Sequence, residues 1–294
     1  MNALCNLYGI RYPLVMGAVA ATPRLGIAVS EAGGLGTIAA ANATPQQLRE
    51  RIAEFRAGTS KPWAVNFPIA LMPPDQLEEK IQVCIDERVE AVITSAGSPK
   101  VATARLKAHG IKVAQVVATT YHAQKAAEAG VDAVIAEPVE SGGYRGDNEV
   151  SMMVLIPSIR RALPDMPLVA AGAVADGAGI AAVFALGADG VQLGTRLVAT
   201  TESELPSHYH KLILAAEDTS TASAEGRVRP RVAKPEFAEA VLGEKRRIQM
   251  GQVSALITDV APAAEIIERI FREAAQVAGR NAERLNAFGA ALSH

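Results

Sequence analysis

The residues from Leu168 to Arg196 decide the fold: LVAAGAVADGAGIAAVFALGADGVQLGTR. Two short apolar runs, Leu168–Ala171 and Gly190–Leu193, flank a longer segment with helical composition. Both runs are predominantly apolar on both faces, which is typical of parallel strands covered by helices on their outer face. The stretch therefore predicts a strand, a helix and a second strand of one parallel sheet.

The same alternation runs through most of the chain. The other predicted strands are Pro13–Met16, Leu35–Ile38, Trp63–Asn66, Ala91–Thr94, Lys112–Val117 and Ala133–Ala136. The predicted helices are Thr44–Phe55, Asp75–Glu87, Ala102–His109, Tyr121–Ala129, Val150–Ala162, Asp176–Leu186 and Pro262–Ala278. Eight strands alternating with such helices, the strands falling within about 200 residues, favour an α/β fold of the (β/α)8 TIM barrel type.

An open, doubly wound sheet is the structural alternative. Such a sheet has a glycine-rich GxGxxG loop after its first strand. Here the first strand leads into Met16-Gly-Ala-Val19, which lacks that pattern, and the glycine-rich loops follow the last three strands. Barrels build phosphate sites at this position, so the barrel is favoured.

Two of these loops predict a phosphate site. Small residues let a ligand approach the backbone, and free N–H groups at a helix start bind anions. The expected contacts are Gly172, Ala173, Gly194 and Thr195. Tight turns without a ligand are the alternative.

The loop after the sixth strand is the candidate active-site edge. It reads Glu137-Pro-Val-Glu-Ser-Gly-Gly-Tyr-Arg-Gly146 and combines two carboxylates, two glycines, an aromatic and a basic residue. A solvated surface loop is the competing interpretation. Asp176, after the seventh strand, is expected to cap a helix.

Residues 201–251 interrupt the alternation of strands and helices, and we interpret this segment as a lid over the barrel mouth. A loop of this length in a compact domain is usually functional or mobile. The chain thus divides into a barrel, 1–200 and 252–294, and an insertion. The basic run Arg227–Lys234 within the insertion is interpreted as a solvated loop, with attraction of a phosphorylated or carrier-borne substrate as the alternative.

Composition excludes several classes of protein. The formal net charge of -2 and the aromatic fraction of 4% disfavour nucleic-acid binding. Cys5 and Cys84 have neither disulfide nor metal-site spacing, so no metal is expected. Without an apolar run of about 18 residues or a signal peptide, the expected location is cytoplasmic, with no membrane partner.

The order of several motifs resembles a known family. They are Tyr12–Ala20 (YPLVMGAVA), Glu31-Ala-Gly-Gly-Leu-Gly-Thr-Ile38, Ala64-Val-Asn66, Thr94-Ser-Ala-Gly97, Glu137-x-x-Glu-Ser-Gly-Gly143, Ala170-Ala-Gly-x-x-Ala-Asp-Gly177, Gln192-x-Gly-Thr-Arg196 and Gly251-Gln-Val-Ser-Ala-Leu-Ile257. Together they resemble the FMN-dependent nitronate monooxygenases, formerly 2-nitropropane dioxygenases, which are related to the flavin-dependent type II enoyl-acyl-carrier-protein reductases. The resemblance covers nearly the whole chain.

The resemblance implies FMN as cofactor. It places the flavin ring near Gly17, Asn66 and Gln252 and the phosphate on the last two loops. Gly142 and Gly143 join the cofactor-binding set through the motif that contains them.

The chain departs from the family at two positions. The usual histidine after the paired glycines, the family's catalytic base, is Tyr144 here, and the usual polar start is Met16-Gly-Ala-Val19. A phenol with a pKa near 10 is a poor base at neutral pH but can donate a proton. We expect Tyr144 and Glu137 to be the catalytic residues, with packing or substrate stacking as the alternative for Tyr144. His208 or His210 on the insertion could replace the missing imidazole, although exposed loop histidines are commoner.

The expected function is FMN-dependent oxidation of nitronates or nitroalkanes with oxygen. The first alternative is an enoyl reductase that uses NAD(P)H to reduce an activated double bond. The second is a non-redox isomerase or synthase whose loops bind a substrate phosphate, and the third is a flavin-binding protein without turnover. The substrate is expected to be a small molecule, and a homodimer stays open.

Overall fold

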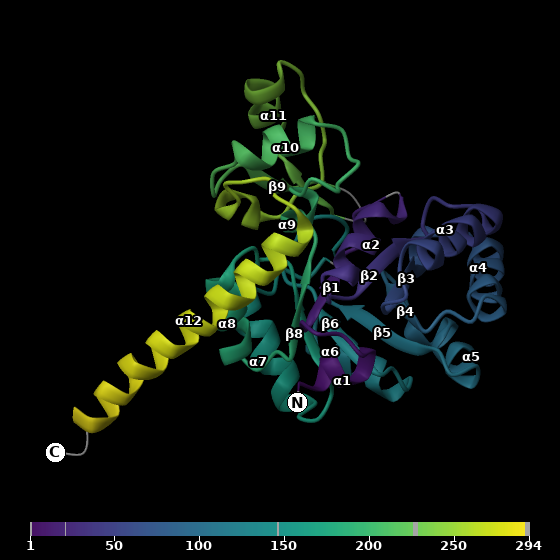
Figure 1. Cartoon of the computed structure of the whole chain (residues 1–294), viewed down its shortest axis with the longest axis horizontal. Helices are drawn as coiled ribbons and strands as arrows, with labels where there is room; N and C mark the ends of the chain where they lie inside the picture. Colours follow the sequence, from purple (N-terminus) through teal and green to yellow (C-terminus); the bar gives the residue numbers. More distant parts are fainter. Residues whose placement is uncertain (1, 21, 146, 226–228, 292–294) are drawn as a thin grey trace.

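The short apolar runs form one parallel sheet that closes into a barrel (Figure 1). The computed structural model describes residues 2–20, 22–145, 147–225 and 229–291. Its strands are β1 (Leu14–Met16), β2 (Gly36–Ala39), β3 (Trp63–Pro68), β4 (Ala91–Ser95), β5 (Lys112–Val117), β6 (Ala133–Ala136), β7 (Leu168–Ala171) and β8 (Gly190–Leu193). Neighbours in sequence pair in parallel from β2 to β8, and β8 pairs with β1.

The barrel closes between β1 and β2. Leu35 donates its N–H to the Leu14 carbonyl at 2.8 Å, and Met16 donates to the Leu35 carbonyl at 2.9 Å. These bonds form a parallel bridge between Val15 and Leu35. The predicted (β/α)8 barrel is confirmed, and each predicted strand lies within two residues of an observed one.

Helices cover the outside of the barrel. They are α2 (Pro23–Glu31), α3 (Pro45–Gly58), α4 (Pro74–Asp86), α5 (Thr103–Ala108), α6 (Thr120–Glu128), α7 (Met152–Ala162), α8 (Gly177–Ala185) and α12 (Ala263–Ala291), with 3-10 turns η1 (Ile69–Leu71) and η2 (Pro99–Val101). The expected capping box begins α3, where the Thr44 hydroxyl accepts from the Gln47 N–H. The Asp176 carboxylate caps α8 by accepting from the Gly179 N–H at 2.8 Å, as predicted.

Small residues fill the barrel interior. Ala64, Ala114 and Ala133 belong to a buried cluster with Val15 and Leu35 from the neighbouring strands. The short helix α1 (Ala3–Tyr8), which was not predicted, adds Leu4 and Tyr8 to the same cluster. Because this cluster contains residues from α1 and from the strands, the N-terminal helix packs on the barrel interior. The opposite end of the barrel, at the carboxyl ends of the strands, is left for a ligand site.

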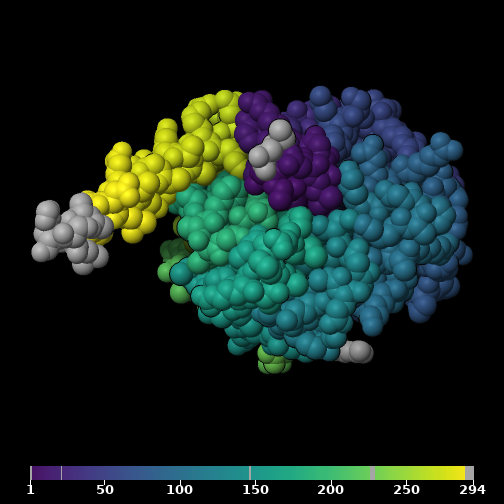
Figure 2. All heavy atoms as spheres, turned by 90° about the horizontal axis from the view of Figure 1, so that it is seen from below, coloured from purple at the N-terminus to yellow at the C-terminus, as the bar shows by residue number. Residues whose placement is uncertain are grey.

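The last helix is longer than its sequence pattern suggested. The prediction ended at Ala278, whereas α12 continues to Ala291 and extends away from the barrel beyond α8 (Figures 1 and 2). The apolar periodicity weakens after Ala278, but alanine, arginine and glutamate are good helix formers, so the helix continues. In the described residues we find no helix with both the length and the apolar content needed to cross a membrane.

The 201–251 segment is folded rather than a bare loop. It contains α10 (His208–Leu214), the antiparallel strands β9 (Thr221–Ser223) and β10 (Arg231–Ala233), and α11 (Pro235–Leu242). Leu212, Ile213, Ala233 and Ala238 belong to a buried cluster that also includes Ala175, Val198 and Ala199, so the segment packs against the loops after β7 and β8. We name residues 201–251 the cap. These elements were not predicted, because they are too short to show a clear periodicity in the sequence.

Candidate functional site

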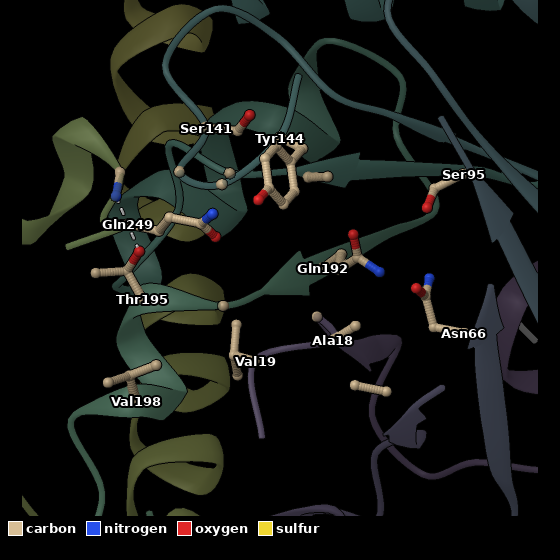
Figure 3. A pocket seen from close by; sticks show the side chains of 18 of the residues that line it. Ala18, Val19, Asn66, Ser95, Ser141, Tyr144, Gln192, Thr195, Val198 and Gln249 are labelled. Carbon is tan, nitrogen blue, oxygen red and sulfur yellow. Dashed lines mark hydrogen bonds between the residues drawn. The ribbon is translucent and has the colours of Figure 1, made fainter. Parts of the chain in front are cut away.

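A cavity of about 600 Å³ lies at the carboxyl ends of the strands. Every strand of the barrel supplies a lining residue near its carboxyl end or just beyond it: Gly17, Ala39, Asn66, Ser95, Val116, Glu137, Gly172 and Gln192. The cap adds Leu205, Tyr209, Ile213, Arg247 and Gln249. Figure 3 shows the polar side chains of Asn66, Gln192 and Gln249 around this space. Its position and size are those of a ligand site in a barrel.

The loops after β7 and β8 form one wall of the cavity. Gly172 and Ala173 have φ angles of 72° and 54°, both in the left-handed region. This region strains a residue with a Cβ atom such as Ala173, and such strain clusters at functional sites. Gly172, Gly194 and Thr195 line the cavity, whereas Ala173 does not.

Gly172 is required because another loop crosses it closely. A Cβ atom at this position would lie 2.4 Å from the Ser141 Cβ and 2.7 Å from its Cα. Gly142 is similarly restricted, since its Cβ would lie 2.6 Å from the Gly251 nitrogen. The loop after β6 is thus pressed between the loop after β7 and the end of the cap.

Ser141 has an unsatisfied hydroxyl in the cavity wall. Its side chain is buried, and its Oγ makes no hydrogen bond of good geometry among the described residues, although the Glu137 carboxyl group lies near enough for the hydroxyl to affect its pKa. An unpaired buried polar atom costs free energy comparable to a lost hydrogen bond. Together with the glycine-rich loops on either side, it fits a ligand that carries polar oxygens, such as a phosphate ester.

Among the described lining residues of the cavity, Glu137 is the one that carries a carboxyl group. Burial raises the pKa of its carboxyl group to about 7, and the nearby Ser141 hydroxyl and the Arg145 charge oppose that rise. A carboxyl group with this pKa is present in both protonation states at neutral pH, so Glu137 can donate or accept a proton.

Tyr144 lies at the cavity mouth with half of its surface exposed. Its ring faces the cavity (Figure 3). No histidine is among the described lining residues. His210 bonds the Val198 carbonyl through Nε2 at 2.8 Å, and His208 stacks on Tyr209, so the structure does not favour the alternative in which one of them replaces the missing imidazole.

Gln249, rather than Gln252, lines the cavity. The Gln252 side chain is exposed and outside the lining, although its N–H donates to the Glu140 carbonyl at 3.1 Å. Gln249 lies between the buried residues Ile248 and Met250 and pairs with Val232 of β10. This alternation, typical of a strand, was the sequence signal that could have identified Gln249.

A buried arginine joins the cap to the Tyr144 loop. Arg231 donates its backbone N–H to the Gly143 carbonyl and its Nε to the Val139 carbonyl, both at 3.1 Å. Burial lowers the pKa of its guanidinium, and Arg145 lowers it further. The interpretation of Arg227–Lys234 as a solvated loop is therefore wrong for Arg231; Arg227 lies outside the described residues.

The chain is similar to proteins of known class. The nitronate monooxygenase family model matches residues 1–239. A nitronate monooxygenase from Paraburkholderia phytofirmans is 30% identical over 77% of this chain and 75% of its own length. The solved structure of FabK from Thermotoga maritima is 36% identical, with a TM-score of 0.87, and covers 98% of this chain and 99% of that one.

The chain matches only part of a second curated relative. The (3aS,4S,5R,7aS)-5-hydroxy-7a-methyl-1-oxo-octahydro-1H-indene-4-carboxyl-CoA dehydrogenase of Rhodococcus jostii is 37% identical over 76% of this chain. That match spans 62% of the relative, less than two thirds of its length. The chain belongs to the nitronate monooxygenase family.

Proposed function

We propose that the cavity binds FMN. The loops that carry Gly172, Gly194 and Thr195 would hold the phosphate, and the Ser141 hydroxyl would gain a partner there. Gly17 and Asn66 would contact the ring, while Gly142 and Gly143 keep the loop after β6 close to it. Gln249 would lie near the ring, in the position that the family resemblance implied for Gln252. When bound, FMN supplies hydride transfer between an electron donor and the substrate.

The reaction we favour is reduction of an activated carbon–carbon double bond with NAD(P)H. The carrying observation is Glu137, whose pKa of about 7 leaves it partly protonated at neutral pH. One carbon of the double bond receives a hydride and the adjacent carbon receives a proton. Glu137 would donate that proton, and the Tyr144 hydroxyl would hydrogen-bond the substrate's carbonyl oxygen as negative charge develops on it.

The relatives support this choice. The Rhodococcus dehydrogenase is named for a carboxyl-CoA compound, in which a thioester activates the adjacent carbons. The similarity to FabK extends over 99% of that chain.

Nitronate oxidation is the second candidate, and the ionised form of the Glu137 carboxyl group favours it. The ionised Glu137 can remove the acidic proton of a nitroalkane, the step that the family histidine would otherwise perform. The Paraburkholderia relative is a nitronate monooxygenase.

The cap would act as a lid in either reaction. Tyr209, Ile213 and Gln249 line the cavity from this segment, so cap movement would change access to the site. The division into a barrel and an insertion at residues 201–251 is part of this proposal.

Anaerobic spectroscopy tests the proposal. The purified chain, incubated with FMN, is expected to show a flavin band that NADH or NADPH bleaches and an unsaturated thioester restores. Bleaching by a nitroalkane but by neither pyridine nucleotide would support the second candidate instead. A protein that binds no FMN would overturn both candidates.

A further inference from the structure

A buried lysine lies behind the loop that follows β2. Lys80, on α4, is 0% exposed. Its Nζ donates to the carbonyl oxygens of Ala40 at 3.0 Å and Ala41 at 3.3 Å. No carboxylate of the described residues pairs with it. A buried charge is costly unless it is paired or hydrogen-bonded, so these carbonyl dipoles hold the ammonium group in place.

This arrangement fixes the peptide planes of the loop. In a planar trans peptide the C=O and N–H bonds point in opposite directions, and none of the described peptide bonds is cis. Because the carbonyls of Ala40 and Ala41 face Lys80, the N–H groups of Ala41 and Asn42 point away from it. Both residues line the cavity.

These two N–H groups have no acceptor among the described residues, in contrast to their neighbour. The Ala40 N–H donates to the Asn66 carbonyl at 3.1 Å. Ala41 is half-buried and Asn42 is exposed, so the two donors lie at the rim of the cavity rather than on its floor. A ligand that enters from solvent can reach them.

A second cation supports the same loop. Arg51, on α3, donates from Nη1 to the Ala39 carbonyl at 2.9 Å and also lines the cavity. Burial lowers the pKa of Lys80, and Arg51 lowers it further. Two preoriented N–H donors near two cations can stabilise negative charge on oxygen without reorganising during the reaction.

We propose that the Ala41 and Asn42 N–H groups, oriented by Lys80, form a binding subsite for a carbonyl or oxyanion oxygen. The oxygen belongs either to the flavin ring or to the substrate, as an enolate or nitronate. The identity of the ligand rests on the proposed function, whereas the pair of donors does not. Lys80 is a positioning residue, because it acts through the backbone and does not itself reach the cavity.

Backbone amide NMR of the full-length chain tests the subsite. Nitrate serves as the probe, because its planar oxygens mimic a nitronate. We expect saturable shifts of the Ala41 and Asn42 amide signals. Little change is expected at Gly110 and Gly130, which lie in the turns that precede β5 and β6, at the opposite end of the barrel. Shifts upon FMN addition identify the flavin as the oxygen source, and shifts with nitrate on the FMN-loaded chain identify the substrate. No shift with either ligand overturns the proposal.

A variant tests the role of Lys80. Lys80→Met is expected to weaken binding of whichever ligand shifts these amides at least fivefold, whereas Lys125→Met, on the exposed face of α6, should not. Unchanged affinity in a folded Lys80→Met protein would overturn the positioning role. If that variant does not fold, the wild-type titration still decides whether the donors bind an oxygen. FMN binding is measured separately by quenching of flavin fluorescence, so a failure of the proposed function would be distinguishable.

Discussion

Ser141 lies against Gly172 so closely that a methyl group on the glycine would come within 2.4 Å of the serine Cβ. The contact joins the loops after β6 and β7, which carry the proposed acid and the proposed phosphate site. Neither loop can move here without moving the other. The packing of these two loops therefore fixes the cavity wall that both reactions need.

Gly172→Ala is expected to destabilise the fold by at least about 2 kcal/mol, because it combines a left-handed backbone with an overpacked contact. It should also weaken FMN binding. Gly110→Ala is the matched control, since Gly110 has a φ of 75° but a methyl group added there would meet nothing within 4 Å. Denaturant unfolding of both variants measures the difference. Equal losses of stability would show that the contact with Ser141 has no energetic importance.

Glu137→Gln should remove a pH dependence of stability. The folded pKa of about 7 lies above the ordinary value of 4.5, so the folded state binds a proton more tightly than the unfolded chain. This contribution is fully present below pH 4.5 and is lost as the pH rises through 7, about 3 kcal/mol in all. Urea unfolding of the ligand-free chain at pH 5 and pH 8 should show the glutamine variant gaining stability relative to wild type at the higher pH. A constant difference between the two proteins would contradict the raised pKa.

The pH profile of turnover should separate the two candidate reactions. A protonated Glu137 is needed for reduction, so that rate should fall above pH 7; an ionised Glu137 is needed for nitroalkane oxidation, so that rate should rise through the same range. Rates measured with preformed nitronates, which need no base, provide the control. A profile that Glu137→Gln leaves unchanged would exclude this carboxyl group from proton transfer.

Tyr144→Phe is expected to lower kcat/KM at least tenfold, about 1.4 kcal/mol, because the variant keeps the ring but removes the hydroxyl. Steady-state kinetics with the accepted substrate measures the effect. Tyr121→Phe, on the exposed surface of α6, is the control. If both variants retain the wild-type rate, Tyr144 serves only to pack or stack.

Asp176→Ala should destabilise the protein by about 1 kcal/mol, since it removes the N-cap of α8. Asp165→Ala replaces an exposed carboxylate that makes no hydrogen bond among the described residues and should change stability little. Thermal unfolding compares the two. Similar melting temperatures would mean that solvent replaces the cap without cost.

The barrel could be predicted because its strands are short, apolar runs separated by helices of regular period. Short elements were harder. α1 has only six residues, and the elements of the cap are stabilised by contacts distant in sequence, such as that between Ala233 and the Ile248 carbonyl. Local patterns do not record such contacts.

The candidate site was predictable where a motif marked it. Gly17, Asn66, Glu137, Tyr144, Gly172, Gly194 and Thr195 all line the cavity, together with Gly142 and Gly143. The roles of Lys80 and Arg51 could not be predicted, because each acts on a loop at least 12 residues away through a carbonyl that any residue could provide. The proposed role of these two cations depends on the orientation of the backbone peptide groups, and the amino-acid sequence does not specify that orientation.

The bond between Arg231 and Gly143 has a kinetic consequence. The cap hairpin cannot lift from the barrel unless this bond and the one to Val139 break, or unless the loop that carries Tyr144 moves with it. Any exchange of ligand that requires the cap to lift is therefore no faster than the opening of this junction. A slow step in product release would then have its origin at a buried arginine, outside the cavity lining.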